Sequence, residues 1–263
     1  EKIRAIYEKV KAAGLIFAFH PITPDLQDIN SMREAFQKIA ALGYKDVQLQ
    51  GASMDIPDEE IARALKDAGL NCIATQEDYP FGFGDDPERY IKRAVTCGAK
   101  YLTFALIPRE VDTLEKLEEF AEKIRAIYEK VKAAGLIFAF HPITPDFRML
   151  GGVPVYERLM DLLPNDMQLT FCVYSAFGTE VTAAEVLEKF KGRVDLVHFK
   201  DGVPGADGKA QLMPLGQGAH DWQPVFDLCK AAGVNYIFGE QERWQKDAFD
   251  CAADTYAYLH TLK

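Results

Sequence analysis

Short runs of β-branched and aromatic residues alternate along the chain with longer segments in which apolar residues recur every three or four positions. The runs are typical of buried strands, and the longer segments are typical of amphipathic helices. Strands are predicted at residues 15–20, 46–50, 71–76, 101–107, 137–141, 167–174, 194–200 and 235–240. Strands that alternate with helices form a parallel sheet, and eight such units close into a barrel. The pattern therefore predicts one α/β domain over residues 1–263, a (β/α)8 barrel.

The helical segments carry matching end signals. Several of them end in glycine just before a strand, in the sequences AALG, KDAG and KAAG. Glycine tolerates the positive φ that a helix C-terminus often requires. The longest helical pattern runs from Thr113 to Ala134, and its apolar residues fall on one face: Leu114, Leu117, Phe120, Ile124, Ile127 and Val131. We expect this face to pack against the barrel.

One segment occurs twice without a single substitution. Residues 1–25 are identical to residues 122–146. The identity indicates engineering, a very recent duplication or a sequence error, and engineering is the favoured interpretation. The second copy contains the end of the long helix, so the first copy predicts an extra N-terminal helix at residues 1–13. Two identical segments can compete for one strand position, which leaves both a monomer and a homodimer open.

Composition narrows the class of protein. The 263 residues are 48% hydrophobic and 27% charged, enough for one buried core. The net charge of −10 offers no basic patch, so nucleic acid is not an expected partner. Membrane spans and a signal peptide are not expected either. The five cysteines are widely spaced and form no CxxC pair, which indicates reduced thiols and a cytoplasmic location. A small-molecule substrate is the expected partner.

The strand ends carry polar side chains. In a TIM barrel the C-terminal strand ends line the active site, and every second strand residue points inward. The inward register predicts that the mouth is lined by His20, Gln48 or Gln50, Gln76, Ala105, His141, Cys172, His198, Lys200 and Glu240. One such histidine is as often a hydrogen-bonded core residue as a functional one. Three of the five histidines meet at this rim, which favours a functional site.

Four segments of the chain contain sequence motifs that together indicate a family. They are residues 193–201 (RVDLVHFKD), 216–222 (GQGAHDW), 239–242 (GEQE) and 40–47 (AALGYKDV). Together they resemble the sugar phosphate isomerase/epimerase family, which has a xylose isomerase-like TIM barrel, and the resemblance covers nearly everything from about residue 30 onward. It implies a divalent metal at the mouth (Mn, Mg or Zn) and acid–base chemistry on a hydroxy-ketone or sugar. On that pattern His198 and Glu240 match two metal ligands.

The chain departs from the family pattern at the mouth. Cys172 stands where the family has an aspartate ligand, and Ser175 stands where it has a tryptophan. Gln76 occupies a position that often holds histidine, and residues 140–148 differ from the YHNH segment of related members. Because these departures share one location, they indicate a pocket refitted for other chemistry.

This pattern favours an engineered cysteine hydrolase, an esterase with a Cys/His dyad. A histidine that takes the proton of Cys172 would leave a thiolate able to attack an acyl carbon. His141 is the preferred base and His198 the second choice, because both lie on strands expected beside that of Cys172. Glu240 is a further catalytic candidate. The substrate and oxyanion candidates are Gln76, Lys200, Tyr174 and His20.

Two other functions stay open. Cysteine is also a common buried filler, and Cys172 can equally belong to a residual Cys/His/Glu metal site. The alternative is therefore a divalent-metal-dependent sugar phosphate isomerase or epimerase, and the third possibility is an inert designed scaffold. No cofactor is expected for the esterase. Asp201 and Glu242 are candidates to orient a histidine or bind water, and the loop at 202–219 is either a lid or an ordinary connection.

Overall fold

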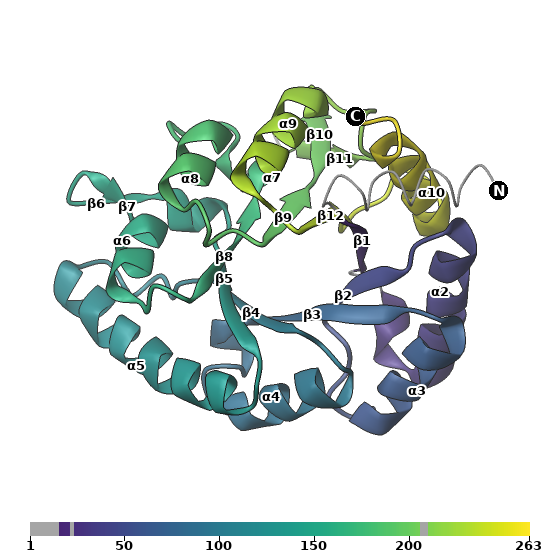
Figure 1. Ribbon diagram of the computed structural model, residues 1–263, viewed down its shortest axis with the longest axis horizontal. Helices are drawn as coiled ribbons and strands as arrows, with labels where there is room; N and C mark the ends of the chain where they lie inside the picture. The colour runs from purple at the N-terminus through teal and green to yellow at the C-terminus, as the bar shows by residue number, and fades with distance from the viewer. Residues whose placement is uncertain (1–15, 22–23, 206–209) are drawn as a thin grey trace.

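The eight segments with the strand pattern form a closed parallel barrel with helices around it (Figure 1). The computed structural model describes residues 16–21, 24–205 and 210–263, and side chains from residue 26 onward. The barrel strands are β1 (Ile16–Pro21), β2 (Asp46–Gln50), β3 (Asn71–Asp78), β4 (Tyr101–Ala105), β5 (Ile137–His141), β8 (Gln168–Cys172), β9 (Leu196–Phe199) and β12 (Tyr236–Gln241). Around the barrel their order is β1-β12-β9-β8-β5-β4-β3-β2. The predicted TIM barrel is confirmed.

Helices follow most strands and cover the outside of the barrel (Figure 1). The α-helices are α2 (Ile29–Leu42), α3 (Asp58–Ala68), α4 (Pro87–Thr96), α5 (Leu114–Ala133), α6 (Val155–Leu162), α7 (Val173–Ala176), α8 (Ala183–Lys189), α9 (Trp222–Ala232) and α10 (Ala248–Leu259). The 3-10 turns are η1 (Pro24–Gln27), η2 (Tyr79–Phe81) and η3 (Thr144–Phe147). The extra helix predicted at residues 1–13 lies outside the described residues. Within the described ranges, no helix has the length and apolar character needed to span a membrane.

Helix α5 shows how the local sequence sets an element. The side chain of Thr113 accepts a hydrogen bond from the backbone N–H of Lys116 and caps the first turn. The chain leaves the helix at Gly135, which has a φ of +79°. The predicted apolar face is buried except at its first residue, Leu114, which is 48% exposed. That residue lies in the first turn, at the end of the contact with the barrel.

Two apolar layers hold the barrel strands in place. Outward-facing side chains pack under the helices, and the ring of Phe104 lies 5.3 Å from that of Phe138 and 4.7 Å from that of Phe140. A smaller cluster fills the interior and comes from the first halves of its strands: Ala74, Tyr101, Leu196 and Phe238. Because apolar groups close the interior near the strand starts, the polar residues gather at the opposite end, where the strands finish.

The segment at 202–219 contains a hairpin that the sequence pattern did not predict. Strand β10 (Asp201–Pro204) pairs antiparallel with β11 (Ala210–Met213). The buried carboxylate of Asp201 accepts hydrogen bonds from the backbone N–H groups of Gly202, Gly216 and Gly218 at 2.9 to 3.1 Å. Asp201 therefore anchors this connection to the end of β9, where the sequence had suggested that it orients a histidine or water.

Candidate metal centre

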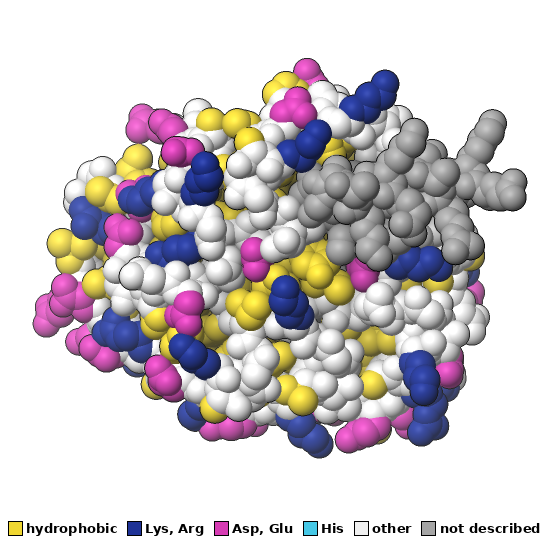
Figure 2. Space-filling view, in the orientation of Figure 1, with side chains coloured by type: hydrophobic (Ala, Val, Ile, Leu, Met, Phe, Trp, Pro, Cys, Tyr) yellow, Lys and Arg dark blue, Asp and Glu magenta, His cyan; other side chains and the backbone are white. Residues whose placement is uncertain are grey.

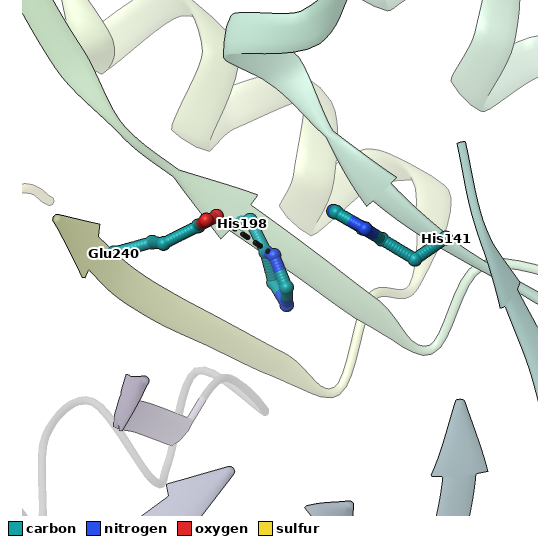
Figure 3. Close-up of side chains that lie close together, drawn as sticks. All are labelled: His141, His198 and Glu240. Carbon is teal, nitrogen blue, oxygen red and sulfur yellow. Dashed lines mark ion pairs between the residues drawn. The ribbon is translucent and has the colours of Figure 1, made fainter. Parts of the chain in front are cut away.

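Three side chains from three strands converge at the barrel mouth. His141 ends β5, His198 lies in β9 and Glu240 lies in β12. Each offers one ligand atom, and these atoms all lie within 4.8 Å of one another. Figure 3 shows the imidazole of His198 between the carboxylate of Glu240 and the imidazole of His141. All three side chains are buried, so they form a site with little competing water.

The central contact joins the side chains of His198 and Glu240. Nδ1 of His198 lies 2.9 Å from Oε2 of Glu240 (Figure 3). The ring centroids of His198 and His141 are 4.6 Å apart with a tilt of 41° between the planes. Two imidazoles and one carboxylate thus face a common volume. This ligand set is one that divalent transition metals bind in enzymes.

Lys200 adds a positive charge beside this cluster. Its Nζ lies 3.6 Å from Oε1 of Glu240 and forms a second ion pair with Glu242. Burial alone would lower the pKa of Lys200, but the charges of the two carboxylates outweigh burial and raise it. The ammonium therefore stays protonated at neutral pH. Burial and the charge of Glu240 raise the pKa of Glu242, against the opposing effect of Lys200.

A row of glutamine side chains crosses the barrel interior to His198. Oε1 of Gln48 lies 2.8 Å from Nε2 of His198, and Nε2 of Gln48 donates to Oε1 of Gln76 at 2.8 Å. Nε2 of Gln76 donates to Oε1 of Gln50 at 3.0 Å, and Nε2 of Gln50 donates to Oδ1 of Asp78 at 3.5 Å. All the residues of this row lie on strands β2 and β3. The row ends at Asp78, which is its only carboxylate.

The direction of this row determines how His198 is oriented. A carboxylate oxygen accepts, so each amide in turn presents its N–H toward Asp78 and its oxygen toward His198. The oxygen of Gln48 is matched by a proton on Nε2 of His198. This leaves Nδ1, the atom that faces Glu240, as the ring nitrogen that can coordinate a metal ion. A metal-binding histidine is commonly oriented by a hydrogen bond from its other ring nitrogen, the one that does not bind the metal.

The environment of Cys172 does not favour a nucleophile. The side chain is 1% exposed. Burial and the charge of Glu240 raise the pKa of the Cys172 thiol to about 12, although Lys200 and a hydrogen bond with Ser175 oppose them. A thiol with this pKa is protonated at neutral pH, while the predicted dyad requires a thiolate. The two-histidine and glutamate cluster of the described residues does not include Cys172.

The remaining predicted site residues take different positions. Gln76 is the middle of the glutamine row, where its Oε1 accepts from Gln48 and one N–H of its Nε2 donates to Gln50. The ring of Tyr174 lies under Lys200, with 5.4 Å from Nζ to the ring centroid. The backbone of His20 is in register with Glu240, but its side chain lies outside the described residues.

Sequence reasoning missed the glutamine row and Asp78. The predicted third strand ended at Gln76, whereas β3 continues to Asp78. Gln48 and Gln50 were predicted as alternatives, yet both point inward because they are two residues apart in β2. The signal that could have found Asp78 was the same alternation, continued by one more step past Gln76.

Comparison with known proteins places these residues in a wider context. Residues 36–253 match the family model described as xylose isomerase-like TIM barrel. No curated protein sequence matches the chain. A sugar phosphate isomerase/epimerase from Parabacteroides distasonis ATCC 8503 superimposes with a TM-score of 0.75 at 18% identity, over 94% of this chain and 93% of that one.

Two other solved structures have the same fold. The 3-keto-D-glucoside 4-epimerase of E. coli has a TM-score of 0.70 at 16% identity, over 94% of this chain and 99% of that one. A xylose isomerase-like TIM barrel protein from Mycobacterium smegmatis, in complex with magnesium, has a TM-score of 0.69 at 14% identity, over 94% and 95%. At such identities the likeness concerns the fold.

Proposed function

Because the chain belongs to the family of xylose isomerase-like TIM barrels, we propose that its barrel mouth binds a divalent metal ion and moves a proton on a hydroxy-ketone sugar, as an isomerase or epimerase. The observation that carries this proposal is the convergence of His141, His198 and Glu240 within 4.8 Å. It replaces the esterase favoured by the sequence with the alternative that the sequence left open.

The residues present fit a metal ion. Two imidazoles and a glutamate are the protein ligands of several catalytic zinc sites, which leave a further position for water or substrate. The family pattern has an aspartate where this chain has Cys172, and His141 supplies a third ligand in its place. Imidazole suits Zn²⁺ better than Mg²⁺, which prefers an all-oxygen shell. Among Mn, Mg and Zn, the ligand set therefore favours Zn²⁺.

The neighbouring side chains supply the rest of the chemistry. A bound divalent ion would polarise the carbonyl of a hydroxy-ketone. Lys200, kept protonated by its two carboxylate partners, places a positive charge beside an oxygen that becomes negative when the adjacent carbon loses its proton. The Glu242 side chain, which is 29% exposed beside Lys200, is the proposed base that takes that proton and returns it.

Proton transfer of this kind can be observed without knowing the natural substrate. We expect the zinc-loaded protein to exchange the hydrogen beside the carbonyl of dihydroxyacetone or D-fructose for solvent deuterium in D2O, followed by NMR. Removal of the metal with EDTA should abolish the exchange, and added Zn²⁺ should restore it. Exchange that is absent with and without Zn²⁺ would leave the inert scaffold as the better description.

The glutamine row makes a separate prediction about metal affinity. Gln48→Leu removes the acceptor for Nε2 of His198 and frees the imidazole to rotate or change tautomer. We expect the dissociation constant for Zn²⁺ to rise about 10- to 100-fold, measured by competition with a chromophoric chelator.

The matched control is Gln168→Leu, which makes the same change at the first residue of β8, far from the mouth. ¹⁵N NMR of the metal-free protein adds a readout that does not involve metal. The wild type should show a hydrogen-bonded Nε2–H on His198, and Gln48→Leu should not. Equal zinc affinity in Gln48→Leu and Gln168→Leu would show that Gln48 does not position His198.

A further inference from the structure

An open pocket lies beside the metal centre on the rim of the barrel. Its volume is about 440 Å³, within the range of small-molecule sites. Thr144, Tyr174 and Gly202 contribute to its wall, and they follow His141, Cys172 and Lys200 by two or three residues. Segments that follow β5, β8 and β9 therefore line the pocket, and two of these strands, β5 and β9, carry His141 and His198 of the metal centre.

Three aromatic rings form a corner in this pocket. The rings of Phe177 and His220 stack with centroids 3.6 Å apart and 14° between their planes. The ring of Tyr174 stands nearly perpendicular to both, at 81° and 87°. All three side chains are half-buried, so each still presents ring surface to the pocket. Such a corner suits a flat or CH-rich ring, which can stack on one wall and meet the other edge-on.

The described residues of the pocket carry no charge that would select a phosphate group. None of the described residues that line it is Lys, Arg, Asp or Glu. Burial lowers the pKa of His220 despite the opposing charge of Asp201, so its imidazole is neutral at pH 7. Lys200 approaches from the metal centre over the Tyr174 ring, but it is held in ion pairs with Glu240 and Glu242. Phosphate recognition often uses free cationic side chains, which the described lining does not offer.

We propose that this aromatic pocket holds an uncharged ring attached to the reacting sugar, so that the substrate is a glycoside with its ketone elsewhere on the sugar ring, and not a sugar phosphate. The inference rests on the proposed function, because the pocket is a subsite only if the metal centre next to it is the reaction site. Lys200 links the two parts: it contacts Glu240 on one side and the ring of Tyr174 on the other. The ring can be an aryl group or a second sugar, since both stack on aromatic side chains.

Binding can test this subsite without turnover. Trp222 packs against both Phe177 and His220, with centroids 5.9 Å and 6.1 Å away, so its fluorescence reports on the pocket. The probes are phenyl β-D-glucopyranoside, cellobiose, methyl β-D-glucopyranoside and glucose 6-phosphate, titrated into the full chain with and without Zn²⁺. We expect the phenyl glucoside or cellobiose to bind about 10-fold more tightly than the methyl glucoside, which corresponds to about 1.4 kcal/mol and lies within the range for one aromatic contact. The tighter of the two identifies the ring as aryl or sugar.

Variants assign the preference to the pocket. Phe177→Ala should reduce the preference for the ring-bearing glucosides to about 2-fold or less. Phe177→Leu keeps apolar bulk and protects the fold, and it should also reduce this preference. Phe249→Ala on α10, outside the pocket, should leave it unchanged. Equal binding of the methyl and ring-bearing glucosides, or tightest binding of glucose 6-phosphate, would overturn the inference. Loss of deuterium exchange with the ring preference intact would instead count against the proposed function.

Discussion

Glu240→Gln is expected to lower deuterium exchange on a hydroxy-ketone by about 1000-fold. The carboxylate is the one charged ligand in the His141, His198 and Glu240 cluster, and the amide is nearly the same size. Loss of that charge weakens the hold on a divalent ion, which contributes several kcal/mol to stabilising a developing negative charge. About 4 kcal/mol corresponds to this factor. The exchange rate at saturating Zn²⁺ and the zinc dissociation constant are measured on the same sample.

A matched control separates this effect from a general loss of structure. Glu118→Gln makes the same change on the exposed face of α5 and should leave both quantities within about 2-fold. Circular dichroism melting curves of the two variants show whether each has folded. Glu240→Gln with wild-type exchange and wild-type zinc affinity would remove Glu240 from the site.

Alkylation of Cys172 is expected to be slow, by a factor on the order of 1000 relative to a free thiol at pH 8. Burial and Glu240 hold the pKa of this thiol near 12, so the thiolate is scarce compared with an ordinary cysteine of pKa about 8.5. Because deprotonation increases with pH, the rate should climb through alkaline pH without a plateau near neutrality. Iodoacetamide labelling followed by peptide mass spectrometry distinguishes Cys172 from Cys97 and Cys229, whose pKa values burial also raises to about 12.

The same residue distinguishes the two enzyme classes. Cys172→Ala should retain deuterium exchange within about 3-fold, because no proposed step uses the sulfur. A dyad would behave in the opposite way: rapid labelling at a single site near pH 7, and an acyl-transfer activity lost in Cys172→Ala. That outcome would restore the esterase hypothesis.

The fold was predictable because strand alternation and helix periodicity are local signals. Each barrel strand lies within about two residues of its predicted position, from β1 at Ile16–Pro21 to β12 at Tyr236–Gln241. The β10–β11 hairpin was missed because its segment is rich in glycine and proline. Its order comes from the Asp201 carboxylate, which binds the N–H groups of Gly216 and Gly218 further along the chain.

The location of the site could be predicted from the sequence, but the chemical state of its side chains was harder to predict. Alternation put His141, His198 and Glu240 at one rim, and the structure brings them together. The state of Cys172 depends on burial and on the distance to Glu240 and Lys200, which spacing along the chain does not give. The cross-barrel contact of Gln48 with His198 joins residues 150 positions apart and depends on side-chain length.

Part of the repeated segment forms a strand in both of its copies. The sequence IFAFH forms β5 and most of β1, so both copies supply a strand to the same barrel. The two strands have different neighbours, since β1 pairs with β12 and β2, whereas β5 pairs with β4 and β8. That engineering produced the repeat stays a prediction.

Zinc stoichiometry is the most direct test of the metal centre. Metal-stripped wild-type protein, dialysed against Zn²⁺ and analysed by inductively coupled plasma mass spectrometry, should hold one ion per chain. His141→Ala should lose it, and His260→Ala on the outer surface should keep it. No bound zinc in the wild type, or one ion retained in His141→Ala, would contradict the assignment of His141, His198 and Glu240 as a metal site.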